Sequence, residues 1–248
     1  MTIVTGALEF IGGVVILGWR VLKLVFTARL SASLLLEQMV LLGVNSIPIT
    51  TLVVCFAGSV YTFVLADELS QRNAENLVGG LLLLILLKEL IPVFSALVLS
   101  AKIGAPITSE IGTMKISEQL DALRALSTDH DWYLTLPRVL AGVIMIPLVA
   151  VFAGYGGWFA GYITGHLQTG FSYHTFISGA KNMVGIDDFV ECFVKCIVFA
   201  GVIVLTACYY GYKAEGGAAG VGKAVTRGVV INILLIFILD LLITAVLD

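Results

Sequence analysis

Charged residues are scarce in this chain of 248 residues. Asp, Glu, Lys and Arg make up 12% of the sequence and hydrophobic residues 59%, with a mean hydropathy of +1.03. An ordinary soluble domain carries roughly 25% charged residues. The scarcity of charge therefore excludes a soluble globular domain and predicts a membrane protein.

Other absences narrow the class. The alternation of apolar and polar residues that marks barrel strands is missing, so the membrane spans are expected to be helices. No basic region precedes the first apolar stretch, which argues against a cleavable signal peptide. The four cysteines fall in predicted spans, and no histidine is near Cys192 and Cys196 in sequence to complete a metal site. We therefore expect packing roles for the cysteines and no metal.

Long apolar stretches predict five transmembrane helices, because about 20 residues cross a bilayer as a helix. They cover about residues 40–66, 77–101, 139–165, 189–212 and 228–247. The predicted organisation is an N-terminal segment, 1–39, followed by a membrane domain, 40–248.

The N-terminal segment differs from the spans. Its longest charge-free stretch, Phe10 to Trp19, is too short to span. Arg20, Lys23 and Thr27 then share one helical stripe. We expect residues 6–35 to form a basic amphipathic helix in the membrane interface, with a sixth span as the alternative.

Basic residues predict the orientation. With five spans, one side of the membrane collects ten of the 14 lysines and arginines. They are Arg20, Lys23, Arg29, Lys102, Lys115, Arg124, Arg138, Lys213, Lys223 and Arg227. By the positive-inside rule this side is cytoplasmic, and the N-terminus lies there too.

The longest hydrophilic stretch, residues 102–136, connects the second and third predicted spans. Ile116, Leu120 and Leu123 recur in it at helical spacing, with charged residues on the other faces. This pattern predicts a short amphipathic helix at the cytoplasmic surface. It either lies on lipid headgroups or docks a cytosolic partner.

A second cytoplasmic segment, "GGAAGVGKAVTRG", mimics a phosphate-binding loop. Gly217, Gly222 and Lys223 fit G-x-x-x-x-G-K, but Ala224 stands where a Mg²⁺-binding Ser or Thr is required. No strand is predicted before it. We therefore expect no ATP site in this chain, and a tight glycine turn before the last helix instead.

Several motifs together resemble the MlaE (YrbE-like) family of permeases, which belong to ABC transporters that work with MCE-domain proteins on lipids. The motifs are "KELIPVFSALVLSAKIGAPITSEIGTMKISEQLDAL", "LPRVLAGVIMIPLVAV", "GGAAGVGKAVTRGVV" and "LDLLITAVL", in that order. Lys88 stands for a usual arginine, and Ile91 for the glycine before Pro92. We expect Pro92 to break the helix.

The resemblance implies a five-span permease without enzymatic activity of its own, situated in the bacterial inner membrane. It implies a homodimer that moves phospholipid or a related lipid, a cytosolic ABC ATPase that binds ATP and Mg²⁺, and a periplasmic MCE-domain protein. In some systems a STAS-domain protein also attaches to the ATPase. No cofactor in this chain and no nucleic-acid partner are expected.

Four charged residues inside predicted spans are candidates for a functional role: Lys88, Glu89, Lys195 and Asp240. A charge at mid-bilayer costs roughly 2.5 to 3.5 kcal/mol on insertion scales. Lys88 and Glu89 point about 100° apart on a helix, so each needs a partner elsewhere. They either form buried pairs, such as Glu89 with Lys195, that fix helix packing, or line a lipid pathway, the role that the resemblance favours.

Residues around the predicted cytoplasmic helix are candidates for coupling to the ATPase. They are Glu110, Gly112, Thr113, Met114, Glu118, Asp121 and Arg124. In the proposed mechanism the helix from Ile116 to Leu126 passes the ATPase movement to the second and third spans.

Two other functions compete with this one. A proton-coupled secondary transporter would use Glu89 and Asp240 as a relay and need no ATPase. An intramembrane enzyme is disfavoured, because no G-x-S-x-G occurs and the three histidines lie outside the spans.

Overall fold

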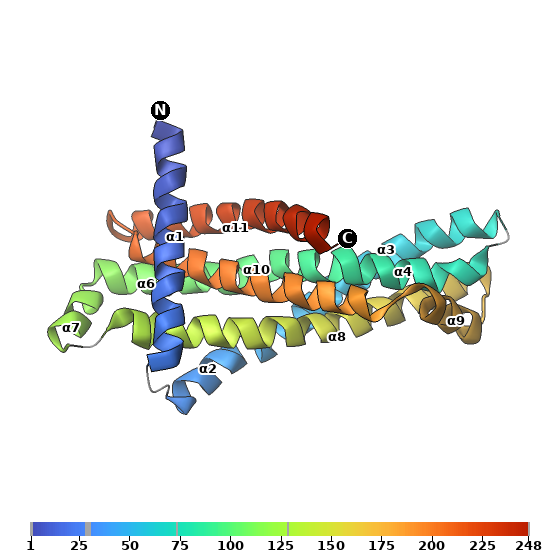
Figure 1. Ribbon diagram of the computed structural model, residues 1–248, viewed down its shortest axis with the longest axis horizontal. Helices are drawn as coiled ribbons and strands as arrows, with labels where there is room; N and C mark the ends of the chain where they lie inside the picture. Colours follow the sequence, from blue (N-terminus) through green and yellow to red (C-terminus); the bar gives the residue numbers. More distant parts are fainter. Residues whose placement is uncertain (1, 28–30, 73, 128, 248) are drawn as a thin grey trace. The chain divides into compact units, whose positions relative to one another are not determined.

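The structure, a computed structural model, describes residues 2–27, 31–72, 74–127 and 129–247, and the regular elements in these ranges are all helical (Figure 1). Six stretches of the described residues are helical, long enough and apolar enough to cross a membrane: Leu8–Thr27, Ala32–Ser70, Glu75–Ile116, Asp131–Thr169, Ile186–Tyr212 and Gly217–Leu247. Large apolar side chains such as Phe56, Phe152 and Leu241 lie exposed along them, as expected of a lipid-facing surface. The prediction of an all-α membrane protein is confirmed.

The chain divides into two compact units. The first comprises Met1–Gly43, Leu99–Met145 and Ala200–Leu235, and the second Val44–Val98, Ile146–Phe199 and Ile236–Asp248. Helices α8 (Leu136–Thr169), α10 (Ile186–Tyr212) and α11 (Gly217–Leu247) supply residues to both units.

Helix α1 (Thr2–Thr27), in the first unit, buries little of its surface. Leu17 and Val21 are buried, while Ile16 and Trp19 are more than half exposed. Because α1 is long and apolar enough to cross a membrane as well as to lie on one, its interfacial placement stays a prediction. Arg29 and the predicted helix through residues 28–30 lie outside the described residues.

The first predicted span is interrupted near its start. Helix α2 (Ala32–Leu42) ends at Gly43, a short 3₁₀ turn, η1 (Val44–Ser46), follows, and α3 (Ile47–Ser70) then begins. The predicted span of about residues 40–66 thus falls within the helical stretch Ala32–Ser70, and α3 forms most of it. Pro48 in the first turn of α3 explains the restart, because proline has no N–H to donate to the preceding turn.

The second predicted span continues well past residue 101. A 3₁₀ turn, η2 (Glu75–Leu77), leads into a continuous helical run of α4 (Val78–Ile85), η3 (Leu86–Phe94), α5 (Ser95–Leu99), η4 (Ser100–Gly104) and α6 (Ala105–Ile116). The segments η3 and η4 are π-helical. The expected break at Pro92 was therefore wrong, because a wider turn carries the chain through the proline.

The predicted amphipathic helix through Ile116, Leu120 and Leu123 is shorter than expected. Ile116 ends α6, and α7 (Gln119–Ala125) begins after a turn in which Glu118 has a φ of 60°. That left-handed backbone cannot continue a helix. Helix α7 buries Leu120 and exposes Asp121 and Arg124, so it is amphipathic but separate from α6.

The glycine-rich segment before the last span is mostly helical, not a loop. The turn is confined to Gly216 and Gly217, whose φ values are 83° and 70°, a region that glycine occupies without steric cost. Helix α11 begins at Gly217 and includes Gly222 and Lys223. The predicted tight glycine turn therefore exists, but it is shorter than expected.

A helix that the sequence patterns did not predict, α9 (Tyr173–Met183), packs against α4 in the second unit (Figure 1). A Cβ atom at Gly79 or Gly80 of α4 would meet backbone oxygen atoms of α9. Glycine therefore permits the two backbones to approach closely.

Small residues also join α3 to α8. In the second unit Gly157 faces Val54 and Gly58 of α3, and Gly161 faces Thr62. Gly157 and Gly161, four residues apart on α8, thus form a small-xxx-small pair that packs within one subunit.

Gly58→Ala is expected to destabilise the protein. The added Cβ would lie 2.5 Å from the backbone oxygen of Gly157, so the helices must separate at a cost of about 1–3 kcal/mol. Thermal unfolding in detergent measures this. Gly201→Ala is the matched control, because nothing lies within 4 Å of a Cβ there; equal unfolding temperatures for both variants would contradict the packing.

Candidate functional site

The candidate site is built on the π-helical segment η3. In an α-helix the carbonyl oxygen of Lys88 would accept a hydrogen bond from the residue four positions later, but that residue is Pro92, which has no N–H. The ammonium group of Lys195 on α10 donates to this oxygen at 2.6 Å. The backbone carbonyl of Lys88 thus accepts a hydrogen bond from a charged side chain of another helix.

Lys195 is also surrounded by carboxylates. Its Nζ lies 2.9 Å from Asp240 Oδ1 of α11, 3.1 Å from Glu191 Oε1 of α10 and 3.5 Å from Glu89 Oε1 of η3. The side chain of Lys195 is fully buried, so these contacts replace its hydration. The second unit therefore brings together three of the four predicted residues.

Lys88 joins the same cluster through another carboxylate. Its Nζ lies 3.6 Å from Glu191 Oε2. Glu191 thus lies between the two lysines, and all four predicted residues belong to one network. We call these five residues, Lys88, Glu89, Glu191, Lys195 and Asp240, the charge cluster. If all five are ionised, two positive and three negative charges leave a surplus of one negative charge.

The members of the charge cluster differ in exposure. The side chain of Glu191 is 5% exposed and that of Asp240 12%, whereas Glu89 is 49% and Lys88 24% exposed. Glu89 and Lys88 are therefore the members that a ligand can reach. Lys195, Glu191 and Asp240 hold the network together.

Sequence reasoning missed Glu191. It precedes Lys195 by four residues on α10, the spacing that places two helical side chains on one face. The spacing of four residues between Glu191 and Lys195 was the sequence signal that could have identified Glu191.

The predicted coupling residues are spread over two helices of the first unit. Glu110 of α6 accepts from the guanidinium of Arg138 on α8 at 2.8 Å, and Arg138 is 4% exposed at its side chain. Arg138 also donates to the Leu134 carbonyl at 2.9 Å. The Glu110–Arg138 pair therefore links α6 to the start of α8.

Gly112, Thr113 and Met114 lie on the last turns of α6. A Cβ at Gly112 would contact Ala214 and Val221, so this glycine permits close packing. Thr113 donates back to the Ser109 carbonyl, and Met114 is half-buried.

The other coupling residues are exposed around α7. Glu118 lies in the turn before the helix, and Arg124 pairs with Asp121 at 3.3 Å. Their side chains are accessible to a partner.

The described residues contain no group of His, Cys, Asp and Glu side chains placed to hold a metal ion. The charge cluster itself consists of two lysines and three carboxylates.

Apolar helices that span a membrane and enclose a charge cluster are typical of a membrane transport permease. Comparison identifies the family: the model of the family described as permease MlaE matches residues 35–246. The chain belongs to this family and is an ABC transporter permease.

Curated relatives agree. A probable ABC transporter permease of Rickettsia typhi is 35% identical over 215 residues, 87% of this chain and 83% of the relative. One from Synechocystis is 35% identical, over 86% of this chain and 81% of the relative. One from Rickettsia felis is 32% identical, over 95% of this chain and 91% of the relative.

Lys195→Met is expected to destabilise the protein by about 3–5 kcal/mol, because it leaves buried carboxylates without their cation. Thermal unfolding in detergent measures the loss. Adding Asp240→Asn to Lys195→Met removes one of the unpaired charges and should restore part of the lost stability.

Lys181→Met is the matched control, because Lys181 is exposed on α9. If Lys195→Met and Lys181→Met unfolded at the same temperature, the charge cluster would not stabilise the fold.

Proposed function

We propose that this permease moves phospholipid, or a related lipid, between the bacterial inner membrane and a periplasmic MCE-domain protein. It acts as a homodimer with its N-terminus in the cytoplasm. A separate cytosolic ATPase binds ATP and Mg²⁺ and drives the movement, and a STAS-domain protein attaches to that ATPase in some systems. The observation that carries this proposal is the half-exposed carboxylate of Glu89 within a helical run that is long and apolar enough to cross a membrane.

An exposed charge within a membrane segment is retained when it faces protein, water or a substrate. Glu89 is one of three carboxylates around Lys195 and the most exposed of them. Its carboxylate suits the amine of a zwitterionic headgroup, and the partly exposed Lys88 suits the phosphate. Lys195 is fully buried among carboxylates, so we assign it a positioning role.

The Glu110–Arg138 pair supports a route for coupling. Movement of a docked ATPase reaches α7 first and passes through the turn at Glu118 into α6. The ion pair between the exposed Glu110 of α6 and the buried Arg138 of α8 then transmits it to the start of α8, since breaking the pair would leave Arg138 buried without a counter-ion. The two copies in the dimer approach each other and expel the lipid.

Glu89→Gln is expected to reduce lipid binding by about tenfold or more, because a hydrogen bond to a charged group contributes about 1.5–3 kcal/mol. The fold should remain, since Gln keeps the size of Glu and the site is half exposed. Lipid transfer is measured in vesicles that contain the permease, the ATPase and the MCE protein, with unfolding temperature as the control. Unchanged transfer would contradict the role of Glu89.

Transfer driven by a pH gradient without ATP would favour the proton-coupled transporter.

Simultaneous Glu118→Gln, Asp121→Asn and Arg124→Gln is expected to abolish co-purification of the ATPase. These side chains are exposed, so the fold should persist. Glu110 is left intact because its removal would leave Arg138 buried without a counter-ion. The matched control is Glu68→Gln with Arg72→Gln, an exposed ion pair on α3 and the turn that follows it. Retention of the ATPase by the triple variant would refute docking at α7.

A further inference from the structure

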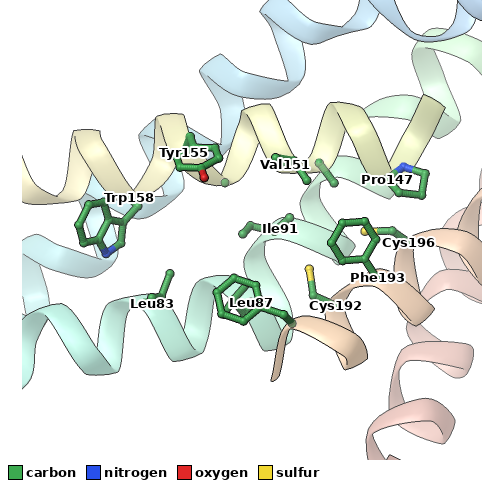
Figure 2. Close-up of a pocket in the computed structure, with 13 residues that line it drawn as sticks. Leu83, Leu87, Ile91, Pro147, Val151, Tyr155, Trp158, Cys192, Phe193 and Cys196 are labelled. Carbon is green, nitrogen blue, oxygen red and sulfur yellow. The ribbon is translucent and has the colours of Figure 1, made fainter. Parts of the chain in front are cut away.

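The second unit contains an apolar pocket apart from the charge cluster. It has a volume of about 420 Å³ and lies between α8, the α4 and η3 run, and α10 (Figure 2). This volume is within the range of small-molecule sites, about 300–1,000 Å³. Leu83, Leu87, Ile91 and Val151 are among its walls, and none of the residues that line it is charged.

The pocket and the charge cluster use different faces of the same helices. On α10 the pocket is lined by Cys192 and Cys196, whereas the adjacent Glu191 and Lys195 belong to the cluster. Neighbouring helical residues point about 100° apart. A ligand of the pocket therefore does not need to contact the buried ion pairs.

The shape of the pocket follows α8. Pro147 and Trp158 lie at its two ends, with Val151 and Tyr155 between them (Figure 2). Eleven helical residues rise about 16 Å. The hydrocarbon of one leaflet, half of a core of about 30 Å, is about 15 Å thick. The pocket thus matches the length of a lipid acyl chain.

One polar group of a residue that lines the pocket has no partner among the described residues. The indole nitrogen of Trp158 is buried and makes no hydrogen bond to the described residues. A buried donor without an acceptor costs free energy, and a ligand with an acceptor at this end of the pocket would remove that cost.

The acceptor is better supplied by a neutral ester than by a carboxylate. A buried carboxylate requires a cation, and no lysine, arginine or histidine lines the pocket. An ester carbonyl accepts the indole N–H without adding charge. These two requirements disfavour a free fatty acid.

We propose that this pocket binds one fatty acyl chain of a membrane phospholipid, with its ester carbonyl accepting a hydrogen bond from Trp158 Nε1. The site is separate from the one that Glu89 forms, and it does not rest on the proposed transport. If Glu89→Gln reduced lipid transfer but left acyl-chain binding in the pocket unchanged, the experiment would distinguish the two sites.

The test uses the full chain, with the proteins that co-purify with it, in nanodiscs of phosphatidylethanolamine and phosphatidylglycerol. The probe is a phosphatidylethanolamine with a photoreactive diazirine midway along one chain, either ester-linked or ether-linked. Mass spectrometry maps the labelled peptides. We expect the ester-linked probe to label the peptides that contain Leu87, Ile91 and Cys196.

Variants locate the site. Val151→Trp fills the pocket and should largely abolish this labelling. Leu148→Trp is the matched control, because Leu148 is exposed on the same helix but does not line the pocket; its labelling should equal that of the unmodified protein. Labelling unaffected by Val151→Trp would overturn the proposal.

Trp158→Phe tests the hydrogen bond while keeping an aromatic ring against Phe176. The unmodified protein should prefer the ester-linked probe by about two- to tenfold, the value of one hydrogen bond, and Trp158→Phe should lose that preference. This comparison within one variant stands even if Val151→Trp does not fold. Equal labelling by both probes in the unmodified protein, or co-purification of free fatty acid alone, would refute the assignment.

Discussion

Complete burial of the Lys195 ammonium group is the constraint on which the second unit depends. Its environment supplies three carboxylate contacts between 2.9 and 3.5 Å and a backbone oxygen at 2.6 Å. A buried ion without such partners costs several kcal/mol. Because the partners come from η3, α10 and α11, the lysine fixes the relative positions of these three helical segments within the unit. The same residue that makes the unit costly to assemble thus determines how it packs.

Pro92 is essential to that arrangement. A regular α-helix through positions 88–92 would lack one hydrogen bond, and the π-helical turn together with Lys195 accommodates the loss. The widened segment presents Lys88 and Glu89 toward the charge cluster and Leu87 and Ile91 toward the apolar pocket. Ile91 also packs next to Gly154 of α8, so a residue larger than glycine fits before the proline because α8 is small at that point.

Hydropathy and charge were sufficient to predict the helical class, most helix positions and four members of the charge cluster. They failed where local geometry competes with periodicity. The helix from Glu75 continues to Ile116 because Ile103, Ile107 and Ile111 are buried in the first unit, although polar residues between them suggested a loop. Helix α9 was missed because its apolar residues are few. Glu191 was missed because pairing within α10 was not considered, and the exposure of Glu89 depends on packing that no linear pattern encodes.

The division of exposure within the charge cluster explains how a ligand could bind without dismantling the fold. Three carboxylates surround one lysine, and Glu89 is both the most distant from it and the most exposed. Breaking a buried ion pair costs about 3–5 kcal/mol when it leaves an ion without a partner, but Lys195 retains Asp240 at 2.9 Å and Glu191 at 3.1 Å if Glu89 turns away. Glu89 can therefore exchange Lys195 for a cationic group of a ligand, while Glu191 and Asp240 keep the lysine neutralised. Glu89 can thus bind a ligand while Asp240 holds the fold together, although both residues belong to one network.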